Sequence, residues 1–292
     1  MAESGLAKIR IVLVEPAGAL NVGAIARVMK NMGLHHLVLV NPKCDPVGEE
    51  ARLMAVHAAD VLEAATVVPT LPTALRGCHR AIATTARPRV ATVLEPPRTA
   101  LPWLLASPSQ ENGAIVFGPE ERGLSNEELN YAQRFVAIPS NPAYASLNLA
   151  QAVGICCYEL YQWEREQEAE GRRQAAEGKQ PTDLLAVASQ HLNRPPTTAS
   201  PLPSPLSPPA SLDALEGYYQ HLEAVLLAIG YLHPHTAASR MQKFRRLFNR
   251  ALPSSEDVTM LRGILSQVGW ATQASSARTT VVKKAQDPAN GS

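Results

Sequence analysis

The sequence predicts an α/β domain with a mostly parallel sheet, followed by a small all-α domain. Three observations lead to this prediction. Short apolar segments alternate with helical stretches between residues 9 and 161, a proline-rich segment follows, and the residues after it carry helical patterns without a strand. Strands that are apolar throughout need helices on both faces of the sheet, which is the arrangement of parallel α/β domains.

Each predicted strand is short, apolar and bounded by Gly, Pro, Asn or Asp. In chain order these strands are Ile9–Val14, Leu37–Val40, Thr66–Val68, Ala81–Thr84, Ala114–Phe117 and Phe135–Ile138. Helices lie between them. The clearest are Val22–Met32, which Gly33 closes as a C-cap, and Ser146–Trp163, in which apolar residues recur at helical spacing.

The second domain is predicted to contain three helices. They are Leu215–Ile229, Ala237–Leu252 and a third that runs from Ser254 or Ser255 to Val268. Asp257 follows Ser254 by three residues, which indicates a capping box at the start of the third helix.

The domain boundaries follow from a change in composition. Seven of the fifteen residues from Pro195 to Pro209 are proline, interleaved with Ser and Thr, and this composition is typical of an extended linker. We therefore expect a first domain at residues 1–167, a linker at 168–211, the helical domain at 212–272 and a flexible tail at 273–292.

Composition excludes several classes of protein. Hydrophobic residues make up 46% of the chain, as in ordinary globular proteins, and no apolar run approaches the roughly 18 residues of a membrane-spanning helix. The N-terminus lacks the pattern of a secretory leader, so we expect a cytoplasmic protein with no membrane partner. The four cysteines form no CxxC and no Cys/His cluster, so we expect neither a disulfide framework nor a metal site. A net charge of +1 says nothing about nucleic acid.

Candidate functional residues lie in four segments that follow predicted strands. The first carries Asn21, Gly23 and Arg27 in an N-x-G-x-x-x-R pattern at the start of a helix; it lacks GxGxxG, so a dinucleotide site is not supported. Taken alone, Asn21 reads better as a helix cap and Arg27 as a solvated side chain. The other loops are residues 84–87, 118–124 and 139–148. Ligands of α/β sheets bind at this edge, where Gly118 permits either close approach to a ligand or a plain turn.

Together, these segments resemble the SPOUT superfamily of RNA methyltransferases, in particular its TrmH-type 2'-O-methyltransferases and the bacterial TrmJ family. The likeness extends to Glu15, to the strand end at Val40–Pro42 and to the helical stretch Met241–Phe248, and it covers nearly the whole chain apart from the proline-rich linker and the tail. It implies a trefoil-knotted domain that forms a homodimer, binds S-adenosylmethionine and methylates the ribose of tRNA at position 32 of the anticodon loop.

The resemblance also implies roles for individual residues. The methyl donor would be held by Thr84, Thr85, Ala86, Gly118, Ile138, Ala145, Ser146 and Leu147. The catalytic arginine of the family falls on Arg27, and Asn21, Glu120, Ser146 and Asn148 match its other polar positions, while Arg87 is expected to contact RNA. Residues 16–20 depart from the family pattern, because they lack the polar groups that usually stand there.

The role of Arg27 allows two readings. A guanidinium stays protonated in proteins, which favours a clamp on the phosphate next to the reacting ribose; a general base is the alternative. The eight histidines lie outside the four segments and read as structural or surface residues.

A basic face is predicted on the middle helix of the second domain. Arg240, Lys243, Arg246 and Arg250 follow one another at steps of three and four, Arg245 lies nearby, and no acidic residue occurs among them. Met241, Phe244, Leu247, Phe248 and Ala251 are expected to form the opposite, packing face. An ordinary solvated face is the plain reading, and contact with RNA phosphates is the one that this segregation of charge favours.

Two functions compete with the methyltransferase. One is a protein that binds RNA or assists assembly and has lost catalysis, and the other is a nucleotide-dependent oxidoreductase. The arginine, glycine, serine and asparagine positions of the motifs argue against the first, and the absent glycine fingerprint argues against the second. Methylation of another RNA nucleotide also remains open.

Overall fold

A computed structural model describes residues 4–85, 93–106, 111–176 and 208–285. The chain divides into two compact units, with the division between Ser204 and Pro205. The predicted linker falls partly outside the described residues, because residues 177–207 are among those not described.

The first unit contains a seven-stranded sheet in the order β3-β2-β1-β6-β4-β7-β5, and every pairing between neighbours is parallel. The strands are β1 Ile9–Val14, β2 His36–Val40, β3 Thr66–Val68, β4 Cys78–Thr84, β5 Leu94–Glu95, β6 Asn112–Phe117 and β7 Arg134–Val136. The predicted parallel α/β domain is thereby confirmed. Strand β5 was not predicted, because two residues carry no recognisable pattern.

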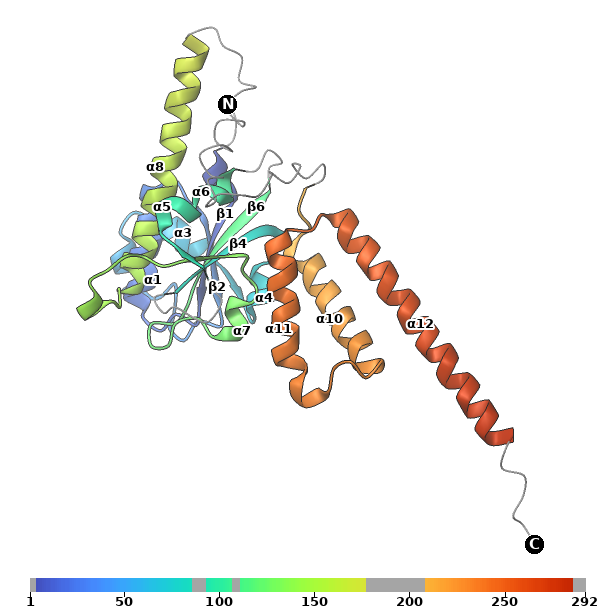
Figure 1. Ribbon diagram of the computed structural model, residues 1–292. Helices are drawn as coiled ribbons and strands as arrows, with labels where there is room; N and C mark the ends of the chain where they lie inside the picture. Colours follow the sequence, from blue (N-terminus) through green and yellow to red (C-terminus); the bar gives the residue numbers. More distant parts are fainter. Residues whose placement is uncertain (1–3, 86–92, 107–110, 177–207, 286–292) are drawn as a thin grey trace. The chain divides into compact units, whose positions relative to one another are not determined.

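Helices surround this sheet (Figure 1). They are α1 Ala19–Asn31, α2 Glu49–Ala55, α3 Ala59–Glu63, α4 Leu71–Ala74, α5 Pro97–Ala100, α6 Pro102–Leu105, α7 Asn126–Leu129 and α8 Leu149–Ala176, with short 3-10 turns η1 Gly5–Lys8 and η2 Pro142–Tyr144. Helix α8 starts later than predicted, because the Asn148 side chain accepts hydrogen bonds from the backbone N–H groups of Ala150 and Gln151 at 2.9 and 3.3 Å. Ser146 therefore belongs to a loop. The helix also ends later, beyond the predicted domain boundary at residue 167.

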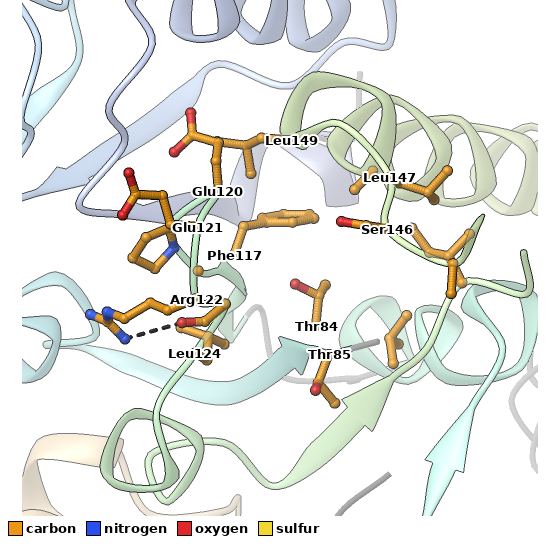
Figure 2. Close-up of a pocket in the computed structure, with 17 residues that line it drawn as sticks. Thr84, Thr85, Phe117, Glu120, Glu121, Arg122, Leu124, Ser146, Leu147 and Leu149 are labelled. Carbon is orange, nitrogen blue, oxygen red and sulfur yellow. Dashed lines mark hydrogen bonds between the residues drawn. The ribbon is translucent and has the colours of Figure 1, made fainter. Parts of the chain in front are cut away.

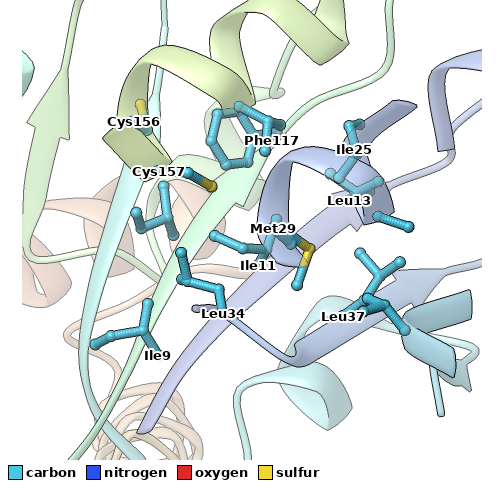
Figure 3. Packing of buried hydrophobic residues seen from close by; sticks show 14 of the residues in the cluster. Ile9, Ile11, Leu13, Ile25, Met29, Leu34, Leu37, Phe117, Cys156 and Cys157 are labelled. Carbon is cyan, nitrogen blue, oxygen red and sulfur yellow. The ribbon is translucent and has the colours of Figure 1, made fainter. Parts of the chain in front are cut away.

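The core of this unit lies between β1, α1 and α8. Figure 3 shows Ile11 and Leu13 of β1 packed with Met29 of α1 and with Cys157 of α8, and all four are fully buried. Each side chain of this size that leaves water stabilises the fold by about 1.5–3 kcal/mol. Burial raises the pKa of Cys157 to about 12, so its thiol stays protonated within the core.

Gly23 of the N-x-G-x-x-x-R pattern has a packing role. A Cβ at this position would lie 2.1 Å from the carbonyl oxygen of Ala51, which belongs to α2. The glycine lets α1 and α2 approach closely, and it thereby fixes the start of the helix that carries Asn21 and Arg27.

The second unit is a three-helix bundle, as predicted, of α10 Leu212–Ala228, α11 Pro234–Ala251 and α12 Ser255–Ala285. The predicted capping box is present, since Ser254 Oγ accepts from the Asp257 N–H at 3.1 Å and the Asp257 carboxylate accepts from the Ser254 N–H at 2.8 Å. Helix α12 continues to Ala285, past the predicted end of the domain at residue 272. The apolar period ends there, but no proline stops the helix before Pro288. In the described part of the chain, no helix is both long and apolar enough to cross a membrane.

Candidate active site

A pocket opens at the carboxyl edge of the sheet, beyond the ends of β4, β6 and β7. The space between its walls is about 920 Å³ when its open mouth is included. The lining includes Thr84, Thr85, Gly118, Ile138, Ala145, Ser146 and Leu147. All seven belong to the set predicted to hold the methyl donor, and Figure 2 shows Thr84, Phe117 and Ser146 around one space. Ala86 and Arg87 lie outside the described residues.

Most other lining residues were not predicted as site residues. The apolar part of the wall is completed by Phe117, Pro119, Leu124, Val136, Leu149 and Ala152. The polar part is completed by Glu121, Arg122 and Gly123, together with Glu120, which was predicted as a catalytic-site residue. Strand ends were the available signal for Phe117 and Val136, which end β6 and β7, because the last core residue of a strand also faces the loops beyond its end. Thr84 ties two of these ends together, since its Oγ1 donates to the carbonyl oxygen of Val116 at 3.1 Å.

Gly118 is required by the protein's own backbone. A Cβ there would lie 2.3 Å from the backbone nitrogen of Leu124 and 2.4 Å from the carbonyl carbon of Gly123. Close packing against the protein's own loop is therefore a further reason for glycine at this position, beside the two readings from the sequence, access for a ligand and a plain turn, which stay predictions. The loop after β6 folds back onto Gly118 so closely that no side chain fits, and this fold-back forms part of the pocket wall.

A chain of hydrogen bonds joins three of the predicted catalytic residues beside this pocket. The Asn148 amide donates to Asn21 Oδ1 at 3.0 Å, and the Asn21 amide donates to Glu120 Oε1 at 3.1 Å. The Glu120 carboxylate also accepts from the backbone N–H groups of Ala17 and Gly18 at 3.2 and 3.4 Å. We call Asn148, Asn21 and Glu120 the polar chain. It connects the loop before α8, the start of α1 and the loop after β6.

The charge of Glu120 follows from these contacts. Burial alone would raise its pKa, but the backbone N–H groups and the Asn21 amide outweigh burial and hold the pKa below its ordinary value. Glu120 is therefore ionised at neutral pH and acts as an acceptor that orients Asn21.

Ser146 and Arg27 are the two predicted catalytic residues outside the polar chain. Ser146 is exposed in the loop that lines the pocket. Arg27 is exposed on α1, six residues after Asn21 and about 9 Å further along the helix axis. It does not line the pocket, and within the described residues it makes no hydrogen bond or ion pair. The structure thus brings four of the five predicted catalytic residues to the pocket or to the polar chain and leaves Arg27 apart from them.

A second network, which sequence reasoning missed, holds the loop after β6. The Arg122 guanidinium pairs with Glu15 at the end of β1 and with Glu128 of α7, each at 2.8 Å. Hydrogen bonds from Arg122 and Lys43 hold the pKa of Glu15 below its ordinary value, and its carboxylate also accepts from the Asn41 amide at 3.0 Å. Burial would raise the pKa of Glu128, but Arg122 and the Ser125 N–H lower it. We call Glu15, Arg122 and Glu128 the carboxylate clamp.

Glu15 of the carboxylate clamp and its partner Asn41 have an unusual backbone conformation. Glu15 and Asn41, which directly follow β1 and β2, both have a φ of 47°, a conformation that costs free energy for residues other than glycine. Hydrogen bonds that continue the sheet offset this cost. The Glu15 N–H donates to the Val40 carbonyl at 2.8 Å, and the Asn41 N–H donates to the Val68 carbonyl at 2.9 Å. The sequence offered one sign of this network, namely that the charged residue Glu15 directly follows an apolar strand.

The basic face of α11 is confirmed in part. Arg240, Lys243, Arg246 and Arg250 are exposed. Arg245 does not belong to this exposed face: its guanidinium pairs with the Glu216 carboxylate through contacts of 2.5 and 2.8 Å and lies 4.5 Å from the centre of the Tyr219 ring. Its contact with RNA stays a prediction. Leu247 and Ala251 are exposed, so the packing face is narrower than predicted, and Ala237 and Met241 are its buried residues together with Asn249.

The sequence is similar to those of known methyltransferases. Residues 8–158 match the family model described as the SpoU rRNA Methylase family, and residues 213–279 match that of the tRNA methyltransferase TrmJ, C-terminal domain. A relative from Cronobacter sakazakii, named tRNA (cytidine/uridine-2'-O-)-methyltransferase TrmJ, is 39% identical over 90% of this chain and 96% of its own. The chain belongs to the TrmJ family. A Pectobacterium atrosepticum TrmJ of the same name is also 39% identical, over 90% of this chain and 97% of its own.

Solved structures agree with this membership. The crystal structure of TrmJ from Z. mobilis ZM4 has a TM-score of 0.70 and 29% identity, over 89% of this chain and 98% of that one. A probable methylase family protein from Haemophilus influenzae gives 0.51 and 31%, over 92% and 99%. As a TrmJ-family protein, the chain is a methyltransferase whose methyl donor is S-adenosylmethionine, and the oxidoreductase alternative is excluded.

The pocket fits this donor. Its lining combines apolar side chains, among them Ile138, Leu147 and Leu124, with the hydroxyls of Thr84 and Thr85, and a donor with an apolar ring and polar groups needs both kinds of surface. In the described part of the chain, no group of three or more His, Cys, Asp or Glu side chains is arranged to hold a metal ion.

Proposed function

We propose that the protein methylates the ribose 2'-hydroxyl of tRNA at position 32 of the anticodon loop, on cytidine or uridine. The polar chain at the donor pocket is the observation that carries this proposal, because it gathers amide groups next to the space where a donor binds. The names of the relatives support tRNA and the two pyrimidines. Position 32 rests on the family resemblance.

Positioning supplies most of the catalysis in this proposal. When bound, S-adenosylmethionine would supply a methyl group from a positively charged sulfonium and would leave as S-adenosylhomocysteine, whose sulfur is neutral, while the proton of the ribose hydroxyl passes to solvent water. The pocket residues hold the donor at a fixed distance from the acceptor oxygen. Such a geometry raises rates by making the reaction effectively unimolecular.

The polar chain and Ser146 orient the ribose. The Asn21 and Asn148 amides each use one N–H within the chain and keep a second N–H for a ligand oxygen. Glu120 fixes the orientation of Asn21 and is a positioning residue. The exposed Ser146 hydroxyl, on the pocket wall, hydrogen-bonds the reacting 2'-hydroxyl.

Arg27 serves as a phosphate clamp. Its exposed guanidinium keeps all five N–H donors for a ligand, and planar bidentate pairing with a phosphate fits this group better than proton abstraction does. Arg27 fixes the nucleotide through its phosphate and stabilises the forming alkoxide through its positive charge. A general base is the alternative role.

The second unit extends the contact with tRNA. The exposed cations of α11 meet phosphates remote from the methylated ribose, and the linker raises their effective concentration. Arg87, two residues after Thr85 in the sequence, adds a further contact with RNA in this proposal. We further propose a homodimer, the knotted threading that the resemblance implies, and the cytoplasm, where tRNA is matured, as the site of action.

Methyl transfer to unmodified tRNA transcripts tests the function. Wild-type protein with S-adenosylmethionine should place one ribose methyl group per tRNA, and mass mapping of nuclease fragments should locate it at nucleotide 32. A methyl group at another nucleotide contradicts the position. Binding of tRNA and of S-adenosylhomocysteine without methyl transfer would instead support the alternative, a binding protein that has lost catalysis.

A further inference from the structure

Tyr144 is an exposed aromatic side chain close to the polar chain. Its side chain is 81% exposed, and it lies two residues before Ser146 and four before Asn148. The backbone around it is nevertheless fixed. The Tyr144 N–H donates to the Asn141 carbonyl at 2.9 Å, and Ser140 Oγ donates to the Ala145 carbonyl at 3.0 Å. The turn therefore holds the main chain in place and leaves the ring in solvent.

The loop that leads into Asn21 contains no side chain that distinguishes one base from another, although the carboxylates of Asp45, Glu49 and Glu50 line a second pocket together with Asn21. Residues 16–20 read Pro-Ala-Gly-Ala-Leu, so that loop offers no polar side chain, and Leu20 is 48% exposed next to Asn21. Phe117, on the pocket wall, is only 1% exposed and cannot stack on a ligand from solvent. Among the described residues of the pocket and the loops around it, Tyr144 is the aromatic side chain that remains accessible.

We propose that Tyr144 stacks on the pyrimidine of the nucleotide whose ribose is methylated. This inference rests on the proposed function. The base is attached to the ribose carbon next to the one that carries the reacting hydroxyl, so a ribose oriented by Asn21 and Asn148 carries its base within reach of the same short loop. Leu20 offers an apolar contact on the α1 side.

Stacking accounts for acceptance of two pyrimidines. Cytidine and uridine differ in groups on the hydrogen-bonding edge of the ring, whereas their flat faces are alike. An aromatic side chain that contacts the face holds either base, because stacking depends little on the base that is stacked. A hydrogen-bonding site would instead favour one base strongly.

A single exposed aromatic residue is common on protein surfaces and needs no function by itself. The position of Tyr144 distinguishes it, since a backbone-fixed turn presents it beside the donor pocket without its lining that pocket. A substitution can therefore separate its effect on tRNA from any effect on the methyl donor.

The experiment compares full-length wild type with Tyr144→Ala and Tyr144→Phe. The matched control is Leu53→Ala, which removes a side chain of similar exposure, 72%, from α2 of the same domain. For each protein, kcat/KM is measured with unmodified tRNA transcripts that carry cytidine or uridine at the acceptor nucleotide. Calorimetry gives the Kd of S-adenosylhomocysteine, and light scattering gives the mass.

Loss of one stacked base lowers affinity by about 1–3 kcal/mol, which is about 5- to 150-fold. We expect Tyr144→Ala to reduce kcat/KM for both tRNAs by a factor in this range. Tyr144→Phe should stay within about twofold of wild type because it keeps the ring face, and Leu53→Ala should match wild type. The Kd of S-adenosylhomocysteine and the mass should be unchanged in every variant.

Three kinetic or binding results would overturn the inference, and so would one change in mass. The first three are unchanged kcat/KM in Tyr144→Ala, an equal loss in Tyr144→Phe, or a weakened donor Kd in Tyr144→Ala. A lower mass for Tyr144→Ala would instead assign the ring to contact with a second copy of the chain, and it would also overturn the inference. Failure of wild type to methylate either tRNA would contradict the proposed function, and that result is distinct from all of these.

Discussion

Three paired arginines of the first unit contrast with the exposed basic side chains of α11 in the second. In the first unit, Arg80, Arg122 and Arg134 pair with Glu111, Glu15 and Glu95 at 3.5, 2.8 and 2.6 Å. In α11, four cations face solvent without an acidic neighbour in sequence. A net charge of +1 conceals this difference, because it sums charges that are already neutralised by contacts and charges that remain available to a partner.

Helix α11 itself contains both a paired and an exposed arginine. Arg245 and Arg246 are adjacent in sequence, but one residue along a helix turns the side chain by about 100°. Arg245 therefore lies against Glu216 and Tyr219 of α10, while Arg246 lies in solvent. The number of basic residues in a helix does not give the number that can contact RNA.

The largest expected effect concerns the backbone of the donor pocket. Gly118→Val would force the loop after β6 away from its position, because even a Cβ would lie 2.3 Å from the Leu124 nitrogen. We expect the affinity for S-adenosylhomocysteine to fall by at least about a hundredfold, equal to about 2.7 kcal/mol, as measured by calorimetry. Gly171→Ala is the control, since nothing lies within 4 Å of a Cβ at that position of α8. Unchanged binding by a folded Gly118→Val would contradict the assigned pocket.

The next prediction tests the exposed cations of α11. Changing Arg240, Lys243 and Arg246 to Gln should weaken tRNA binding and reduce the slope of log affinity against log salt by about one to three units, since each phosphate contact contributes about 0.9. Affinity for S-adenosylhomocysteine should not change. An unchanged salt slope would mean that these side chains form an ordinary solvated surface.

A smaller effect is expected at the carboxylate clamp. Glu15→Gln should weaken S-adenosylhomocysteine binding by roughly tenfold or less, because the partners are partly exposed and solvent screens their attraction. The control is Asp60→Asn, which removes the exposed pair with Lys30 on another face of the domain. Equal losses in both variants would show that the clamp has no specific role.

The clamp also predicts a pH dependence. The pKa values of Glu15 and Glu128 are lowered in the folded protein from an ordinary 4.5, so their contribution is complete above about pH 4.5 and is lost as the pH falls through the lowered values. Donor affinity measured by calorimetry should be flat from neutral pH to about 5 and should fall below 4.5. A loss of affinity between pH 7 and 6 would require a different titrating group.

The smallest effect concerns the paired arginine of α11. Arg245→Gln should lower the free energy of unfolding of the full chain by about 1–2 kcal/mol, because it leaves the half-buried Glu216 without its partner. The salt slope of tRNA binding should match wild type. If urea unfolding shows that Arg245→Gln is folded, a reduced slope of log tRNA affinity against log salt would show that this guanidinium contacts tRNA.

Much of the fold follows from local patterns. Ile9–Val14 and Thr66–Val68 were predicted with their observed bounds, since an apolar run between turn residues has few other stable conformations. The end of α8 at Ala176 lies within the stretch Trp163–Gln180, whose Glu, Gln and Arg residues continue the helical pattern into solvent. The start of that helix was missed because Asn148 competes for the first backbone N–H groups.

The sequence by itself determined the parallel α/β class, the three-helix bundle and, through ordered motifs, the loops that line the pocket. These depend on periodicity and on residue types within a short stretch of chain. Only the tertiary structure decided that Asn148, Asn21 and Glu120 join, that Arg122 reaches back to Glu15, and that Gly118 accommodates its own loop. Each of these contacts joins parts of the chain that only the packed fold brings together, or depends on a loop conformation that residue types do not specify. Which charges neutralise one another, and which remain for RNA, is therefore fixed by packing.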